Sequence, residues 1–163
     1  MTVLTAIAAA DDQPSRTFEA LGRLAQDVSG ARLVTLMTFD AATREAGRVW
    51  TSDDLHYPVA GTKPAEDTIW TRTVLDRHET FVANTIDGIR KVFPDHDLIA
   101  SLGCASCMNL PFVAMGRVLG TANILDAEGY FTPDRIAAID ATLRLPGLAA
   151  FLLNETLKSK GTS

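Results

Sequence analysis

Residues 103–126 read GCASCMNLPFVAMGRVLGTANILD, and this stretch decides the fold. Two runs rich in strand-forming residues, Cys104–Val113 and Arg117–Leu125, flank the tripeptide Ala114-Met115-Gly116. A glycine at the end of a three-residue hairpin loop adopts the left-handed conformation that such a loop needs. The stretch therefore predicts a β-hairpin with a three-residue loop.

The length of this loop sets which side chains share a face of the hairpin. A three-residue loop pairs Val113 with Arg117 and fixes the register of every pair before them. One face then collects the polar or small side chains of Cys107, Asn109, Thr121 and Asn123. The opposite face is apolar or small throughout. We expect the apolar face to pack on helices and the polar face to look toward the long loops of the chain.

The remaining elements follow from hydrophobic periodicity and from the residues that begin and end them. The predicted helices are Arg16–Ser29, Asp67–Arg77 and Thr132 to about Lys158, and the other predicted strands are Arg32–Phe39, Ala46–Thr51 and Thr80–Ala83. This order predicts an α+β domain, with a central antiparallel sheet and the N- and C-terminal helices on one face. Two excursions, Ser52–Thr80 and Asn84–Leu102, are expected to cover a pocket on the other face.

Several residues of the hairpin and of the helix that follows it resemble the second half of a GAF domain. The matching residues are Leu110-Pro111, Gly116, Leu119-Gly120 and Phe131-Thr132-Pro133-Asp134. The resemblance covers roughly Arg16–Lys158 and implies a GAF-like, profilin-like fold. It also implies a sensory domain that binds a small molecule, although GAF domains bind many different ones. On this basis we expect an N-terminal extension at 1–15, the domain at 16–158 and a flexible tail at 159–163.

The amino-acid composition limits the classes of partner that the protein is expected to bind. The chain has 163 residues and a formal net charge of −5, which disfavours a nucleic-acid partner because phosphate binding needs clustered Lys and Arg. The apolar stretch Met1–Ala10 lacks the basic residues of a secretory signal, and no apolar run reaches the ~20 residues of a membrane span. We expect a cytoplasmic protein with no membrane partner, whose two cysteines are reduced.

The polar face of the hairpin is the predicted binding site. Buried amides and hydroxyls need hydrogen-bond partners, and a ligand, ordered water or the backbone of Asn84–Leu102 can supply them. For each aromatic candidate alone a core role is favoured over binding, and for His96 an exposed position in a loop is favoured. The candidate ligand-binding residues are Trp70, Phe93, His96, Cys107, Asn109, Thr121 and Asn123. The expected partner is a small organic ligand of unknown identity, which acts by changing the conformation of the domain, and no cofactor is expected.

Cys104-x-x-Cys107 raises the alternative of a cysteine-dependent redox enzyme or thiol sensor. The relevant branch of the GAF family is the free methionine-R-sulfoxide reductases. The resemblance aligns the reactive cysteine of that branch with Ala100, which cannot act as a nucleophile, and aligns acidic residues of that branch with Asn123 and Leu125. No zinc pattern accompanies the cysteines. We therefore expect no catalytic residue and no metal.

A third interpretation is a dimerisation module without a ligand. The terminal helices are the natural interface, and the apolar run Leu148–Leu153 favours pairing of two copies. A homodimer through the terminal helices is therefore expected with or without a ligand.

Overall fold

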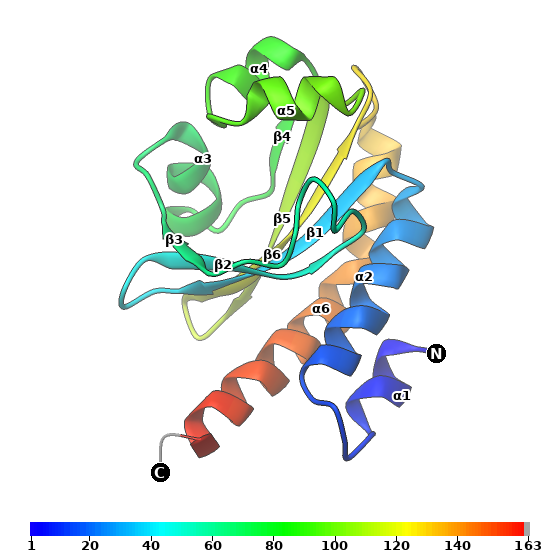
Figure 1. Cartoon of the computed structure of the whole chain (residues 1–163), viewed down its shortest axis with the longest axis vertical. Coiled ribbons are helices and arrows are strands. Elements are labelled where there is room, and N and C mark those ends of the chain that lie inside the picture. The colour runs from blue at the N-terminus through cyan, green and yellow to red at the C-terminus, as the bar shows by residue number, and fades with distance from the viewer. Residues whose placement is uncertain (162–163) are drawn as a thin grey trace.

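A computed structural model describes residues 1–161, without the side chain of Lys63. Across those residues, six antiparallel strands form one sheet in the order β3-β2-β1-β6-β5-β4 (Figure 1). The strands are β1 (Leu33–Asp40), β2 (Glu45–Thr51), β3 (Thr62–Pro64), β4 (Phe81–Ala83), β5 (Ser106–Ala114) and β6 (Arg117–Asp126). The predicted α+β class is confirmed.

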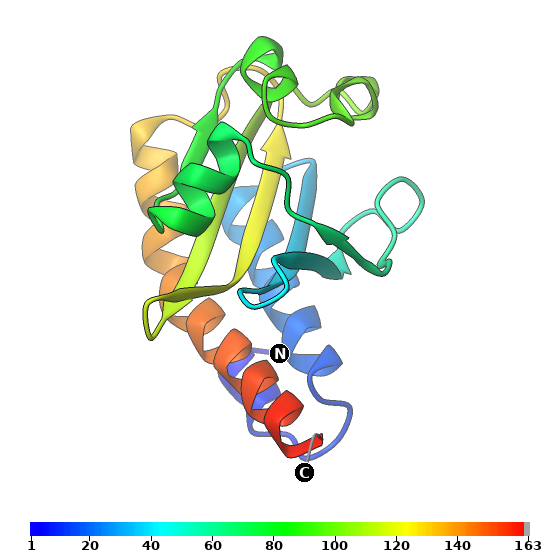
Figure 2. The same cartoon turned by 90° about the vertical axis from the view of Figure 1, so that its left-hand side faces the viewer.

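The two faces of the sheet are covered differently. One face carries α1 (Val3–Ile7), α2 (Ser15–Ser29) and α6 (Pro133–Gly161). The other carries α3 (Ile69–Thr71), its continuation as a π-helical turn η1 (Arg72–Asp76), α4 (Ile86–Arg90) and α5 (His96–Ser101). In Figure 2 α3 and η1 lie in front of the sheet and α2 lies behind it, while α4 and α5 lie around its upper end. This is the predicted arrangement of terminal helices on one side and excursions on the other.

The helix-side core is built from apolar residues of α2, α6 and the central strands. Phe151 of α6 packs at 5.1 Å between ring centroids against both Phe18 of α2 and Phe112 of β5. Gly120 lets α6 approach the sheet, because a Cβ there would lie 2.1 Å from the Phe151 ring and 2.4 Å from the carbonyl oxygen of Met37. The apolar face of the hairpin packs on the terminal helices, as predicted.

The turn between β5 and β6 is shorter than predicted. Met115 and Gly116 form a two-residue turn with φ values of 52° and 71°, a combination that matches the twist of a hairpin. A bulge follows, because Val113 pairs with Val118 and Phe112 with Gly120. The prediction of a three-residue loop was therefore wrong. The shorter turn and the bulge together shift the pairing by two residues from the predicted register, so Asn109 pairs with Asn123. Because the shift is an even number of residues, each side chain stays on its predicted face.

The segment predicted as one helix from Asp67 to Arg77 is instead two short turns. Thr68 caps the first, since its hydroxyl accepts from the backbone N–H of Thr71 at 3.3 Å. Asp67 forms an ion pair with Arg72 at 3.5 Å and is not the cap. Trp70 and Val74 nevertheless pack in one apolar cluster.

The ends of the chain add to the helical layer. Val3 and Ala6 of α1 are buried, and α1 packs against α2 and α6. The helix α6 continues to Gly161, and residues 162 and 163 of the predicted tail lie outside the described residues. The proposed division at residues 15 and 158 stays a prediction.

The helix α6 is apolar on nearly all sides. In the described chain it is the one helix long and apolar enough to cross a membrane, judged by length and composition only. Its inner residues Ile139, Leu143 and Phe151 are fully buried in the helix-side core. Only 28% of its most apolar window is buried, so much of its apolar surface is uncovered.

Candidate functional site

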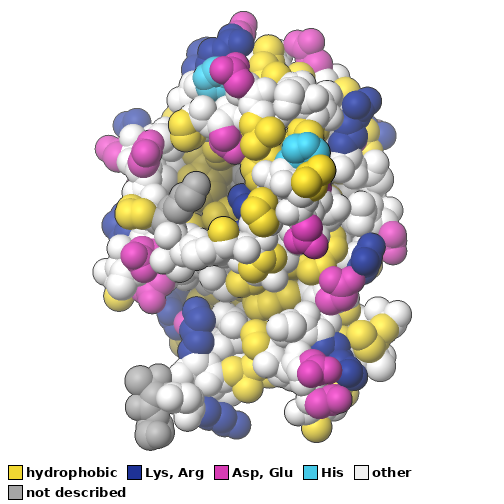
Figure 3. Space-filling model, viewed as in Figure 1, with side chains coloured by type: hydrophobic (Ala, Val, Ile, Leu, Met, Phe, Trp, Pro, Cys, Tyr) yellow, Lys and Arg dark blue, Asp and Glu magenta, His cyan; other side chains and the backbone are white. Residues whose placement is uncertain are grey.

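A cavity of about 330 Å³ lies between the sheet and the excursions that cover it. This volume falls at the lower end of the range found for small-molecule sites. Figure 3 shows the molecule hollowed on this side, with hydrophobic side chains inside the hollow. The lining residues are Leu33, Thr35, Met37, Ala46, Arg48, Tyr57, Pro64, Ala65, Glu66, Thr68, Trp70, Thr71, Val92, Phe93, Pro94, Asp95, Ile99, Cys107, Asn109, Asn123 and Leu125.

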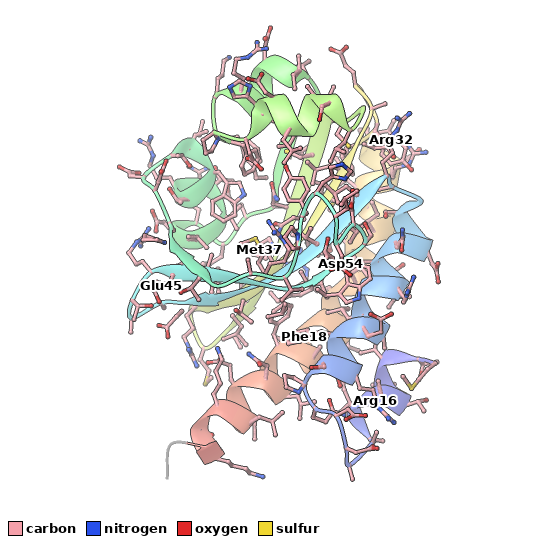
Figure 4. All side chains as sticks on the ribbon, viewed as in Figure 1. Arg16, Phe18, Arg32, Met37, Glu45 and Asp54 are labelled. Atoms are coloured by element: carbon pink, nitrogen blue, oxygen red, sulfur yellow. The ribbon has the colours of Figure 1, made fainter. Side chains whose placement is uncertain are left out.

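The cavity floor follows from strand alternation. Leu33, Thr35 and Met37 of β1 line the cavity, whereas Val34 and Leu36 between them belong to the helix-side core. Figure 4 shows Met37 beneath the covering segments and Phe18 on the α2 side of the sheet. One strand therefore serves both the cavity and the core.

A chain of amide and hydroxyl groups crosses the floor. Asn109 donates from Nδ2 to Asn123 Oδ1 at 2.7 Å, and Asn123 donates from Nδ2 to Thr35 Oγ1 at 3.3 Å. The register places all three on neighbouring strands at one level. Asn109 Oδ1 is buried and has no partner within the described residues. Rotating both amides reverses the chain, so Asn109 can offer either an acceptor or a donor.

Two covering segments are joined at one side of the cavity. The Tyr57 hydroxyl, from the loop after β2, donates to Asp95 Oδ2 at 2.7 Å, just before α5. Burial and this hydrogen bond raise the pKa of Tyr57, so the hydroxyl stays protonated and keeps its donor role. Arg48 lies beneath, with its guanidinium carbon 5.0 Å from the Tyr57 ring centroid.

Arg48 brings positive charge to the floor. Its Nη1 donates to the carbonyl oxygen of Pro58 at 2.8 Å, and its Nε is buried without a partner in the described part of the chain. Burial lowers the pKa of Arg48, and the nearby Tyr57 and Asp95 partly oppose this. The guanidinium remains a cation in spite of the shift, because its normal pKa is above 12.

An aromatic wall closes another side. The Trp70 and Phe93 rings meet edge to face, with centroids 6.4 Å apart and planes at 61°. Trp70 Nε1 is a buried donor with no partner in residues 1–161. The wall therefore offers apolar surface together with one unused hydrogen-bond donor.

The cavity brings together five of the seven predicted site residues. Trp70, Phe93, Cys107, Asn109 and Asn123 line it. Thr121 is buried on the same face, where the sheet pairs it with Met37 and Pro111, but it does not line the cavity. His96 does not line it either, since its Nδ1 lies 3.0 Å from Asp97 Oδ1 at the start of α5.

Sequence reasoning missed the polar residues Thr35, Arg48, Tyr57 and Asp95 of the lining. Thr35 could have been found by extending the alternation of the hairpin to β1, where it pairs with Asn123. Arg48 could have been found as a charge inside the strand predicted over Ala46–Thr51. Tyr57 and Asp95 are far apart in the chain, and no local pattern indicates their contact.

Comparison with known proteins identifies the fold. No family model matches the chain, and no curated protein is similar in sequence. A GAF domain/HD domain protein from Geobacter sulfurreducens aligns with a TM-score of 0.70 at 13% identity, over 86% of this chain and 93% of that one. The GAF domain of a phosphoenolpyruvate-protein phosphotransferase from Acinetobacter aligns with a TM-score of 0.72 at 8% identity, over 96% of this chain and 92% of that one. This chain has the GAF fold.

A further GAF domain of this fold comes from a two-component sensor histidine kinase of Bacillus halodurans. It aligns with a TM-score of 0.66 at 14% identity, over 86% of this chain and 97% of that one. The resemblance inferred from the hairpin and the start of α6 is thereby confirmed at the level of the GAF fold.

Both cysteines of the chain are unpaired and buried in one apolar cluster. Burial raises the pKa of Cys107 to about 12 and also raises that of Cys104. The thiolate is the reactive form of cysteine, so this environment opposes nucleophilic chemistry at neutral pH. Within the described residues, no group of three or more His, Cys, Asp or Glu side chains is placed to hold a metal ion.

The raised pKa of Cys107 predicts a loss of stability in alkali. The unfolded chain releases this proton near pH ~8.5, whereas the folded chain keeps it until about pH 12. Between these values the unfolded state binds fewer protons, so the free energy of unfolding falls by up to about 1.4 kcal/mol per pH unit. Denaturant unfolding from pH 7 to 10.5 should show a steeper decline for wild type than for Cys107→Ala. Parallel declines would contradict the prediction.

Proposed function

We propose that this GAF domain is a sensory domain that binds a small organic ligand between the sheet and the covering excursions. The observation that carries the proposal is the apolar cavity of about 330 Å³ with three buried, unpartnered polar atoms among its lining residues. These atoms are Trp70 Nε1, Asn109 Oδ1 and Arg48 Nε. Each unsatisfied group costs about 1–3 kcal/mol, which a ligand that meets it recovers.

Ligand binding would act by conformational change. The cover is made of separate short segments, and the Tyr57–Asp95 hydrogen bond links two of them at one side of the cavity. A ligand that contacts both segments favours the arrangement in which they are closed, which is a shift of population. The related fold in a sensor histidine kinase supports a sensory role. We place the protein in the cytoplasm, where its two thiols stay reduced.

The burial of both thiols weighs against the thiol-dependent alternative. Cys107 lines the cavity but is fully buried, and its raised pKa disfavours the thiolate. Ala100, which the reductase resemblance aligns with the reactive cysteine, is an exposed residue of α5. The proposed activity is therefore binding, with no catalytic residue.

Blocking the cavity tests the proposal. Ala46 lines the cavity from β2, so Ala46→Phe should fill it, while Ala42→Phe adds the same ring in an exposed turn. Native mass spectrometry of protein purified from its own host should detect an added mass that denaturation releases. We expect the added mass in wild type and Ala42→Phe and its loss in Ala46→Phe. An added mass retained in Ala46→Phe, or absent from wild type, would refute cavity binding.

We further propose that two copies pair along α6 and carry the signal onward. The outer surface of α6 bears a seam of apolar or small side chains with steps of three and four residues, the spacing of a helix–helix contact. The residues of this seam are Ala138, Thr142, Leu145, Ala149, Leu152 and Thr156. Leu145 is 75% exposed and Leu152 37% exposed, so a partner surface would bury substantial apolar area.

A further inference from the structure

The charges around the cavity are arranged by depth. Arg48 is the one Lys or Arg side chain that lines it within the described residues, and it is half-buried on the floor strand β2. The acids Glu66 and Asp95 also line the cavity, but both residues are exposed. Asp95 also accepts a hydrogen bond from Tyr57. Solvent screens charges at a rim more than charges on a floor, so the deeper field is positive.

The guanidinium of Arg48 has no acidic partner. Among the ion pairs of residues 1–161, none involves Arg48. Its neighbours are the carbonyl oxygen of Pro58 and the face of Tyr57, which leaves Nε unpartnered. Asp95 acts on this cation without a direct ion pair, so the Nε donor stays unused, and a planar carboxylate is the group that a guanidinium binds through two parallel hydrogen bonds.

The rest of the lining calls for an apolar body of limited size. Leu33, Met37 and Ile99 join the Trp70–Phe93 wall around the same space. A volume of about 330 Å³ holds on the order of ten water-sized groups. A phosphate monoester would place close to two negative charges opposite this single cation, so a singly charged acid group matches the site better.

We propose that the cavity takes a small monocarboxylate with an aromatic or branched apolar body, whose acid group pairs with Arg48 and whose body packs on Trp70 and Phe93. The inference rests on the proposed ligand-binding function and names the chemistry of that ligand. Trp70 Nε1 and Asn109 supply further hydrogen bonds to a polar substituent on the ligand.

Arg48 also links the ligand to the covering loop. The carboxylate and the Pro58 carbonyl oxygen share the guanidinium, since Nη1 donates to Pro58 and Nε is unused, and Pro58 belongs to the loop between β2 and β3. The same loop carries Tyr57, which is tied to Asp95. An acid on Arg48 is therefore coupled to this loop through one guanidinium.

Three probes of matched shape test the inference: phenylacetate, its neutral amide phenylacetamide, and the cation 2-phenylethylamine. Calorimetry and Trp fluorescence at low ionic strength should show phenylacetate binding at least tenfold more tightly than the amide, and the amine most weakly. Arg48→Met keeps the apolar stem and removes the charge. It should abolish the preference for the acid, whereas Arg23→Met on the exposed surface of α2 should leave it unchanged.

Thermal unfolding of each variant shows whether it is folded. If Arg48→Met fails to fold, Arg48→Lys serves instead, since it keeps the charge and loses the paired donors, so phenylacetate should bind several-fold more weakly. Equal binding of acid and amide, a preference for the amine, or no binding of any probe would each overturn the carboxylate inference. The cavity-blocking experiment with Ala46→Phe is read independently, so the ligand-binding proposal stands or falls on its own result.

Discussion

Replacing Phe151 by alanine should lower the free energy of unfolding by about 3–5 kcal/mol. Phe151 is fully buried, and its ring packs at 5.1 Å against both Phe18 and Phe112. The substitution removes the apolar contacts of one ring and leaves a void between α2, α6 and β5. Because Gly120 lies directly against this ring, the void borders backbone that has no side chain to fill it.

Phe93→Ala provides the matched control for Phe151→Ala. It deletes the same ring from the wall of the cavity, where Phe93 is half-buried and already borders open space. We expect a loss of about 1–2 kcal/mol there, measured by urea unfolding with unchanged m-values. Equal losses at the two positions would mean that the cover is packed as tightly as the helix-side core, which would argue against a ligand cavity.

Leu145→Glu combined with Leu152→Glu should convert the proposed homodimer to a monomer. The two leucines lie seven residues apart on the outer seam of α6, so a partner helix would bury both carboxylates. Burial of unpaired like charges costs several kcal/mol, which corresponds to at least a hundredfold rise in the dissociation constant. Analytical ultracentrifugation across a concentration series measures the change.

The matched control for the dimer is Leu55→Glu, which introduces the same charge at a residue 83% exposed in the loop after β2. It should leave the mass unchanged. A wild-type protein that is monomeric at high micromolar concentration, or a dimer that tolerates both charges on α6, would contradict pairing along this seam. Truncation at Pro146 would be a poorer test, because it removes Gly147, Ala150 and Phe151 from the core.

The faces of the hairpin were predictable from the sequence, whereas its turn was not. Side chains alternate along β5 and β6, so Asn109 and Asn123 lie on one face and Leu110 and Ala122 on the other. This assignment is the same for every register that differs from the predicted one by an even number of residues. The bulge near Leu119 supplies the shift that a two-residue turn alone would lack. Its position depends on how Gly120 meets Phe151 and the backbone of β1, which are long-range contacts.

A residue of the candidate site was predictable only where its position depends on a single strand or a single excursion. Trp70 and Phe93 could be named because each is an aromatic residue in a segment that had to cover the sheet. The contact between Tyr57 and Asp95 joins residues from two excursions, so it required the fold. His96 was misplaced because a helix begins at that residue and directs the imidazole to its neighbour Asp97.

The strand β1 has one more implication for how a signal would leave the cavity. Its side chains alternate between the cavity and the helix-side core, so only one thickness of backbone separates the two. The carbonyl oxygen of Met37, a lining residue, sits where Gly120 and the Phe151 ring converge. A displacement of Met37 by an incoming molecule would therefore press on the long helix through rigid contacts, without any hinge in between.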